Sequence, residues 1–356
     1  MRHRKLELER IQNPMIDWAR IAVAALVVLT LGAVAEDRQV VEQEIDLSSW
    51  SAVTVGVRDL DEALDLWVRD FGFVIDSTRE GPDDDLAPAW GIEPDDIVRQ
   101  ALVRSRNTRH GMLHLVEFAD PEPAVRSGAQ VFDLLPKNLD VYVDDMPARL
   151  AELSERGRTF RNDTFSEVTA PSGITFREMH MPGHDEINVV LLEILGGEEP
   201  LRRDGIAGVG PLILIVGDAV KERSFFERVM RTRKLTDNVL EGPEIEKMVG
   251  LPPGAALDVS IWGRRDQPYG QIELIEYRGV DGENRYPRAR PKSRGILHVS
   301  YEVSSLEPMK RRLDQHRIDF SEHGTVETLY GTGAVMSFFS PAGFRMELHE
   351  RRQDTR

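Results

Sequence analysis

Residues 51–73 read SAVTVGVRDLDEALDLWVRDFGF, and this stretch decides the fold together with a second one like it. It opens with the alternation of apolar and polar residues that is typical of a strand, passes an aspartate, and then spaces Leu64, Trp67 and Val68 along one face of a helix. Residues 210–230, GPLILIVGDAVKERSFFERVM, follow the same order. Both stretches therefore predict a strand, an aspartate near the helix start, and a helix.

The two stretches belong to an internal repeat with an offset of 159 residues. Similar residues share that offset at many places: Asp59 with Asp218, Trp67 with Phe226, Gly91 with Gly250, Pro94 with Pro253, Gly111 with Gly270, and Glu117 with Glu276. A second pair of similar segments begins at Asn138 and His298, which are 160 residues apart. Each half of the repeat thus holds two units, which open near Ala52, Asn138, Pro211 and His298.

Each unit reads as a strand, a helix and about three further strands. A single unit of this kind has a small sheet with one bare face, and pairing two units buries that face. We therefore expect an α+β fold of four βαβββ modules, paired in the order of the sequence. This predicts an N-terminal domain at 48–196 and a C-terminal domain at 207–350, joined around residues 197–207.

Composition narrows the classes of partner and cofactor. The chain of 356 residues has a formal net charge of −16, so its surface repels phosphates and we expect no nucleic-acid partner. It contains no cysteine, which excludes disulfides, thiolate zinc sites, iron–sulfur clusters and a cysteine nucleophile. Any metal must be held by histidine and carboxylate side chains.

The amino-terminal region predicts export. Residues 21–35, IAVAALVVLTLGAVA, carry no charge, follow Arg20 and end in a small-residue pattern before Glu36. This run is shorter than a membrane span but suits the core of a signal peptide. We expect a signal peptide at 1–35, with Met15 as an alternative start, and a periplasmic or secreted protein with no stable membrane span after cleavage. The alternatives are an uncleaved anchor at 21–35 and a buried helix.

The four units resemble the vicinal oxygen chelate superfamily, which includes glyoxalase I, extradiol dioxygenases and bleomycin-resistance proteins. The resemblance covers roughly residues 48–350. It is carried by the strand–Asp–helix openings, by SPAGFRMELHE at 340–350, by GQIELIEYRG at 270–279, and by RGILHVSYEVSSL at 294–306. It implies that paired modules curl into two cup-shaped mixed sheets, with metal ligands on the first and last strand of each module.

Carried onto the C-terminal half, those ligand positions are Pro211, Glu273, His298 and Glu347. Proline cannot coordinate through its side chain, so the resemblance implies a site of Glu273, His298 and Glu347 for Fe, Mn, Ni or Zn. In the N-terminal half the positions are Ala52, His114, Asn138 and either Asn188 or Val190. Only His114 is a good ligand among them, and we interpret that cup as metal-free.

Two functions follow from the resemblance. The first is an exported, divalent-metal-dependent lyase, isomerase or dioxygenase acting on a small oxygenated substrate, with Glu347 and Glu273 as catalytic residues and Glu273 able to act as a general base. The second is a metal-free protein that binds and sequesters a small molecule, as bleomycin-resistance proteins do. Both involve a small-molecule ligand, and both are compatible with a monomer or a homodimer.

Two further features leave alternatives open. The segments 80–96 and 241–255 are equivalent insertions whose short helices carry Trp90 and Met248. They either cover the cups and touch the ligand, or simply cap the open ends of the sheets. His180 and His184 flank a Met-Pro-Gly sequence that prevents a continuous helix, so we predict that they lie in a turn.

Overall fold

The computed structural model describes residue 47 and residues 49–105, 108–196, 205–286 and 290–351. The predicted signal segment at 1–35, the alternative start at Met15 and the alternative anchor at 21–35 lie outside the described residues. Within the described ranges, no helix is long and apolar enough to cross a membrane.

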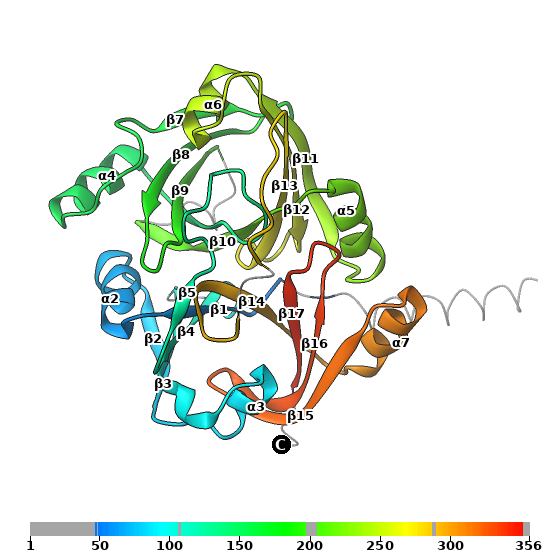
Figure 1. The fold of residues 1–356 in the computed structure, drawn as a ribbon. Helices are drawn as coiled ribbons and strands as arrows, with labels where there is room; N and C mark the ends of the chain where they lie inside the picture. The colour runs from blue at the N-terminus through cyan, green and yellow to red at the C-terminus, as the bar shows by residue number, and fades with distance from the viewer. Residues whose placement is uncertain (1–46, 48, 106–107, 197–204, 287–289, 352–356) are drawn as a thin grey trace, which may run out of the picture. The chain divides into compact units, whose positions relative to one another are not determined.

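Four βαβββ modules follow one another along the chain, as the repeat predicts (Figure 1). The first consists of β1 (Ala52–Val57), α2 (Leu60–Leu64) with its continuation η1 (Asp65–Asp70), β2 (Val74–Glu80), α3 (Leu86–Trp90), η2 (Pro94–Asp96), β3 (Ile97–Arg104) and β4 (Met112–Phe118), followed by the short β5 (Glu122–Ala124). The second consists of β6 (Asn138–Val143), α4 (Met146–Glu155), β7 (Ser166–Thr169), β8 (Thr175–Pro182) and β9 (Asn188–Leu195).

The second half repeats this order. The third module consists of β10 (Ile206–Ile215), α5 (Ala219–Arg228), β11 (Arg233–Glu241), α6 (Pro243–Val249), β12 (Ala256–Gly263) and β13 (Gln271–Arg278). The fourth consists of β14 (Ser293–Val303), α7 (Glu307–His316), β15 (Phe320–Thr328), β16 (Gly331–Phe339) and β17 (Arg345–Arg351). The aspartates predicted near two helix starts are N-caps: Asp59 accepts from the backbone N–H of Asp61 and Glu62, and Asp218 accepts from that of Lys221.

The modules pair differently from the sequence-based expectation. The nine-stranded sheet has the order β15-β16-β17-β14-β1-β4-β3-β2, with β5 added beside β14, so it joins the fourth module to the first. The eight-stranded sheet has the order β11-β12-β13-β10-β6-β9-β8-β7 and joins the third module to the second. Each predicted domain, 48–196 and 207–350, contributes one of its modules to each of the two sheets. The prediction that modules pair in sequence order is therefore wrong. Every module offers a similar first strand to a partner, and the repeat alone does not say which partner it takes.

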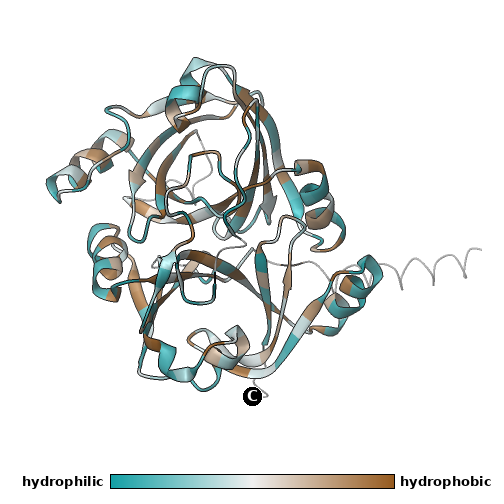
Figure 2. Cartoon of the chain, in the orientation of Figure 1, coloured by the Kyte–Doolittle hydropathy of each residue, from teal (hydrophilic) through white to brown (hydrophobic). Residues whose placement is uncertain are grey.

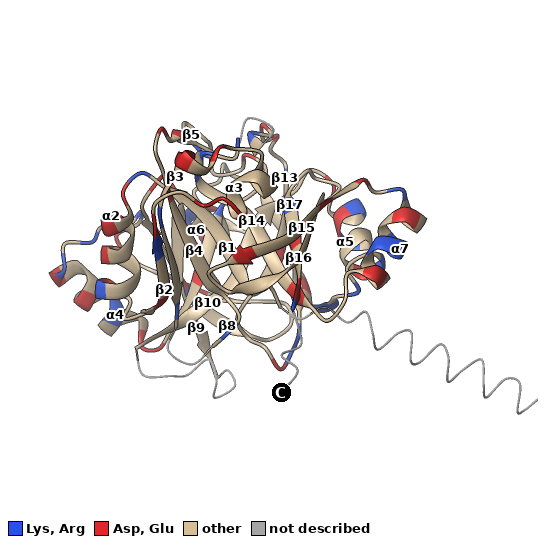
Figure 3. Cartoon of the chain, turned by 90° about the horizontal axis from the view of Figure 1, so that it is seen from below, with Lys and Arg blue, Asp and Glu red and all other residues tan. Residues whose placement is uncertain are grey.

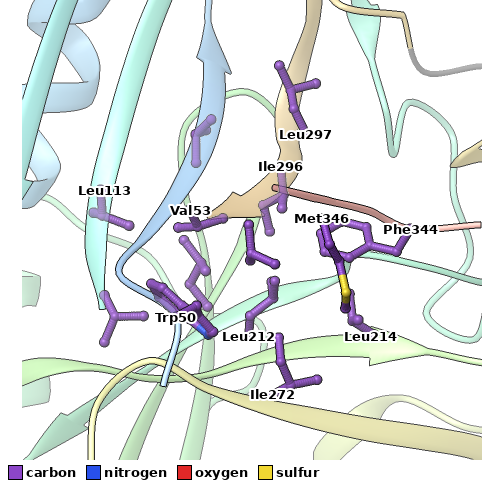
Figure 4. Packing of buried hydrophobic residues seen from close by; sticks show 14 of the residues in the cluster. Trp50, Val53, Leu113, Leu212, Leu214, Ile272, Ile296, Leu297, Phe344 and Met346 are labelled. Atoms are coloured by element: carbon purple, nitrogen blue, oxygen red, sulfur yellow. The ribbon is translucent and has the colours of Figure 1, made fainter. Parts of the chain in front are cut away.

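The main hydrophobic core lies between the two sheets (Figure 4). Val53 and Leu113 reach it from the nine-stranded sheet, and Leu212 and Ile272 reach it from the eight-stranded sheet. Trp50 lies at their junction and donates its indole N–H to the backbone oxygen of Gln271 at 2.7 Å. Figure 2 shows hydrophilic stretches along the helices, and Figure 3 shows charged residues concentrated on helices and connecting loops. The face of each curled sheet that points away from this core is where a ligand site can form.

Candidate ligand site and its filled counterpart

A glutamate on the last strand of each module distinguishes the helix-covered outer face of the sheet from its inner face. Their carboxylates accept hydrogen bonds from backbone N–H groups at the start of the module's own helix, in the pairs Glu117 with Leu60, Glu193 with Met146, Glu276 with Ala219, and Glu350 with Leu306. A residue three positions earlier on a strand points to the opposite face. Glu273 and Glu347 therefore point to the inside of a curled sheet, as the repeat predicts for Glu273.

The inside of the nine-stranded sheet holds His114, His298 and Glu347, and we call it the filled cup. The Trp90 indole from α3 lies between the two histidines, with ring centroids 5.9 Å from His114 and 5.3 Å from His298. Its N–H donates to Oε1 of Glu347 at 3.2 Å. Arg345 donates to the same oxygen at 2.8 Å, and His298 Nε2 lies 3.4 Å from Oε2. Protein side chains therefore occupy the centre of this cup.

Burial and charge fix the protonation of the filled cup. Burial opposes ionisation of Glu347, but its interactions with His298 and Arg345 hold the pKa of this carboxyl well below its usual range. Burial, together with the other buried histidines and against the pull of Glu347, lowers the pKa of His114 to about 3. Burial also lowers the pKa of His298, although Glu347 opposes this shift. The filled cup therefore holds the Glu347 carboxylate bound to the Arg345 guanidinium, beside the neutral imidazoles of His114 and His298.

These residues do not fit the metal centre that the resemblance implies. Arg345 and Trp90 already bond Oε1 of Glu347, and Nε2 of His114 is hydrogen-bonded to Gln100 at 2.8 Å. Among the residues that the structure describes, no three His, Asp or Glu side chains converge to hold a metal ion. The predicted set of Glu273, His298 and Glu347 is also split, because Glu273 lies on β13 of the other sheet. That prediction depended on pairing the modules in sequence order.

The inside of the eight-stranded sheet contains a cavity of about 410 Å³, and we call it the open cup. Apolar side chains from both modules form most of its wall, among them Phe176 and Leu192 of the second module and Ile213 and Leu257 of the third. Met248 of the second predicted insertion also lines it. The two insertions thus have different roles: α3 fills one cup with Trp90, whereas α6 leaves the other accessible and contributes a wall residue.

A polar floor crosses the open cup on β6, β8, β9 and β13. Asn188 donates its amide to Asn138 at 3.2 Å and also contacts Nδ1 of His180 at 3.0 Å. The other ring nitrogen of His180 lies 2.6 Å from a carboxylate oxygen of Glu178. The positions equivalent to metal ligands in this cup hold Asn138, Val190, Pro211 and Glu273, because Val190 lies three residues before the outward Glu193. One carboxyl beside one amide is a poor set for a divalent ion.

Three ionisable groups on this floor have shifted pKa values. Burial, reinforced by the nearby Glu178, raises the pKa of Glu273 to about 8. Burial, with Glu273 and Glu178 close by, raises the pKa of Asp140 well above its usual range. Burial, reinforced by Arg126, lowers the pKa of Lys137 to about 7. Near pH 7 the open cup thus presents acids that are mostly protonated and an amine of which about half is neutral, which suits an uncharged organic ligand.

Sequence reasoning missed three residues of this floor. His180 is predicted to lie in a turn but belongs to β8 and points into the cavity. His184 does lie in the turn after β8, where it also accepts a hydrogen bond from the Trp67 indole at 2.8 Å. Lys137 and Asp140 were not singled out. The alternation of NLDVYV could have placed Asp140 on the same face as Asn138, but no sequence signal shows that this face lines a cavity.

No family model matches this sequence, and no curated protein matches it. Solved structures do match. Glyoxalase I from Zea mays superposes with a TM-score of 0.57 at 13% identity, over 85% of this chain and 92% of its own. A point mutant of the same enzyme superposes with a TM-score of 0.60 at 13% identity, over 88% of this chain and 96% of its own. A proposed dioxygenase from Bacillus subtilis gives 0.54 at 13% identity, over 85% of each chain. With its four βαβββ modules in two curled mixed sheets, this chain has the same fold as glyoxalase I.

Proposed function

We propose that this protein binds a small, mainly apolar organic molecule in the open cup without using a metal ion. The observation that carries the proposal is the contrast between the two cups. Trp90, Arg345 and the histidines fill the centre of one, and the cavity of about 390 Å³ that remains beside them is lined mostly by charged and polar side chains such as Arg104 and Glu302. The other keeps a cavity of about 410 Å³ with mainly apolar walls over a polar floor. Cavities of this size, with apolar walls and a few convergent polar groups, are typical of small-molecule sites.

This proposal corresponds to the second of the two functions expected from the sequence. The first, a metal-dependent lyase, isomerase or dioxygenase, required Glu273, His298 and Glu347 in one site, and the sheets place Glu273 away from the other two. Each sheet is completed by modules of a single chain, so the proposed binding site does not require a second copy.

The binding proposal is tested with N-phenyl-1-naphthylamine, an uncharged probe that fluoresces in apolar cavities. Ile261 is half-buried on β12 and lines the cavity, so Ile261→Trp fills part of it. We expect this variant to weaken probe binding at least about tenfold, which corresponds to the loss of about 1.4 kcal/mol of binding free energy. The matched control is Val220→Trp, since Val220 is 77% exposed on α5. Equal affinities for the wild type and Ile261→Trp would overturn the proposal.

The same titration separates binding from metal-dependent chemistry. Dialysis against a chelator should leave the affinity for the probe unchanged, because the proposed contacts are apolar walls and neutral polar groups. Loss of binding on dialysis, restored by adding Zn²⁺ or Mn²⁺, would instead favour the metal-dependent function.

Export remains part of the proposed function and depends on residues 1–35. The charge-free run at 21–35 and the small residues that end it support a cleaved signal peptide. Expression of the full chain in a bacterial host, followed by amino-terminal sequencing of the periplasmic fraction, should give a protein that starts at Glu36. Retention of the full-length chain in the membrane fraction would favour the uncleaved anchor.

A further inference from the structure

Lys137 is the unusual group in the open cup, and the inference drawn from it rests on the proposed ligand-binding function. It immediately precedes β6, is 6% exposed, and lines the cavity. Its Nζ donates a hydrogen bond to the hydroxyl of Tyr277 on β13 at 2.8 Å. The amine is therefore held by a neutral partner at the wall of a cavity large enough for an organic molecule.

No carboxylate lies within ion-pair distance of Nζ of Lys137 among the described residues. Lys234, Lys292 and Lys310 differ in this respect, since each pairs with an aspartate or glutamate near the protein surface. A buried ammonium ion without a counter-charge is costly, so burial favours the neutral amine. Among the neighbouring groups, Arg126 and Arg161 also disfavour the charge, while Glu178 and Asp140 oppose them, and the resulting pKa is about 7.

We propose that Lys137 is a nucleophile that captures the carbonyl group of an aldehyde or ketone ligand in the open cup as a Schiff base. The Nζ lone pair attacks the carbonyl carbon, and one of the two protons of the neutral amine passes to the carbonyl oxygen to give a neutral carbinolamine. Loss of one proton from nitrogen and of the hydroxyl group as water then forms the C=N bond. The balance is one amine and one carbonyl giving one imine and one water, with no oxidant or reductant.

The cavity also holds acids that can assist the loss of water. Glu273 and Asp140 line the same cavity as Lys137, and the pKa values of both carboxyls are raised by burial, so they retain protons near neutral pH. A protonated carboxyl can donate to the departing hydroxyl group as a general acid. The apolar walls limit the water that would hydrolyse the imine, and a desolvated lysine is the form of this side chain suited to Schiff-base chemistry.

The test uses the full-length protein, benzaldehyde and sodium cyanoborohydride at pH 7, with peptide mapping by mass spectrometry. The reagent reduces an imine to a stable secondary amine, so each modified lysine is marked. A lysine of ordinary pKa is neutral in about one molecule in 2,500 at pH 7. We expect labelling of Lys137 at least about tenfold faster than that of any surface lysine. Lys137→Arg should abolish this adduct, whereas Lys310→Arg should leave it unchanged.

Three outcomes would overturn the Schiff-base proposal. One is labelling spread evenly over the surface lysines of the wild type, a result that does not depend on whether any variant folds. Another is labelling of Lys137 that is just as fast when N-phenyl-1-naphthylamine is present as a competitor, which would place the reaction outside the cavity. If benzaldehyde displaces the probe but forms no adduct at Lys137, the Schiff base is excluded and the binding function survives. If the probe itself does not bind in the cup, the proposed function fails first.

Discussion

Two glutamates at equivalent positions, the half-buried Glu273 of the third module and the buried Glu347 of the fourth, have opposite protonation, and their immediate neighbours account for it. Glu347 has His298 beside it and Arg345 two residues earlier on the same strand face, and both favour its charged form. Glu273 has no hydrogen bond or ion pair to another described residue, and burial raises its pKa to about 8. One glutamate is therefore part of a filled interior, while the other is a neutral acid at the wall of a cavity.

The shift of Glu273 predicts how stability depends on pH. Its folded-state pKa of about 8 lies above the unfolded value of about 4.3, so the folded state binds a proton that the unfolded state lacks between these pH values. The free energy of unfolding should therefore fall as pH rises from 5 to 8, and Glu273→Gln should reduce that fall. Urea titrations at pH 5, 6, 7 and 8 measure the free energy of unfolding at each pH. Ile275→Val, in the same cavity wall, should shift all four values alike; parallel curves for the wild type and Glu273→Gln would contradict the prediction.

The Arg345–Glu347 pair predicts a loss of stability in the filled cup. Arg345→Met leaves the buried carboxylate without its cation, which should lower the free energy of unfolding by about 3 kcal/mol at pH 7. The double variant Arg345→Met with Glu347→Leu should recover most of this loss, because no buried charge remains. Both are measured by urea unfolding followed by tryptophan fluorescence. A loss below about 1 kcal/mol in the single variant would show that Trp90 and His298 suffice to hold the carboxylate.

At the scale of the elements, backbone contacts made at tight turns hold the two sheets together. Gly270 begins the turn into β13, and its carbonyl accepts the backbone N–H of Trp50 at 2.7 Å. Its φ of +74° is left-handed, and a Cβ there would lie 2.3 Å from the backbone oxygen of Trp50. Gly111, its repeat partner, has a φ of +72° and approaches the backbone oxygen of Val209 in the same way. The 159-residue repeat therefore conserves a pair of close contacts between the sheets as well as a local turn.

Gly270→Ala should be far more costly than an alanine at a glycine with similar φ and no close neighbour. Gly324 is the matched control, because its φ is +72° and a Cβ there would meet nothing within 4 Å. We expect Gly324→Ala to lower the free energy of unfolding by about 1 kcal/mol through backbone strain alone. Gly270→Ala should lower it by about 3 kcal/mol or more, since the Trp50 backbone must also move. Equal losses in thermal or urea unfolding would show that the turn relaxes freely.

For the whole molecule, the order of module pairing links the two halves of the chain. The first and fourth modules share one sheet and the second and third share the other, so each half contributes to both cups. The main core then packs the two sheets against each other with side chains from all four modules. Neither half contains a complete sheet or a complete core.

Division of the chain between residues 196 and 205 should therefore abolish folding of the separate halves. We expect fragments 47–196 and 205–351 each to lack a cooperative unfolding transition by circular dichroism, and an equimolar mixture to regain one. The full chain nicked by a protease at the same place serves as the control for the break itself. A half that unfolds cooperatively as a monomer would contradict the observed pairing and support modules paired in sequence order.

Much of this arrangement can be read from the sequence. The repeat predicts four βαβββ modules, the aspartates mark helix starts, and strand alternation separates inward Glu273 and Glu347 from outward Glu276 and Glu350. These are local properties, since helix caps and strand faces depend on residues a few positions apart. The metal site was not predictable in this way, because it required knowing which modules share a sheet.

The sequence by itself determined the module, its four copies and the face of each strand, because short-range periodicity and capping specify them. Only the tertiary structure decided that the first module joins the fourth, that His114 faces His298 and Glu347, and that Glu273 lies apart from them. It also decided that Trp90 fills one cup while Lys137 and Glu273 line a cavity in the other. The physical reason is that similar modules offer similar edges to one another, so packing over the shared core, and not the local pattern, selects the partner.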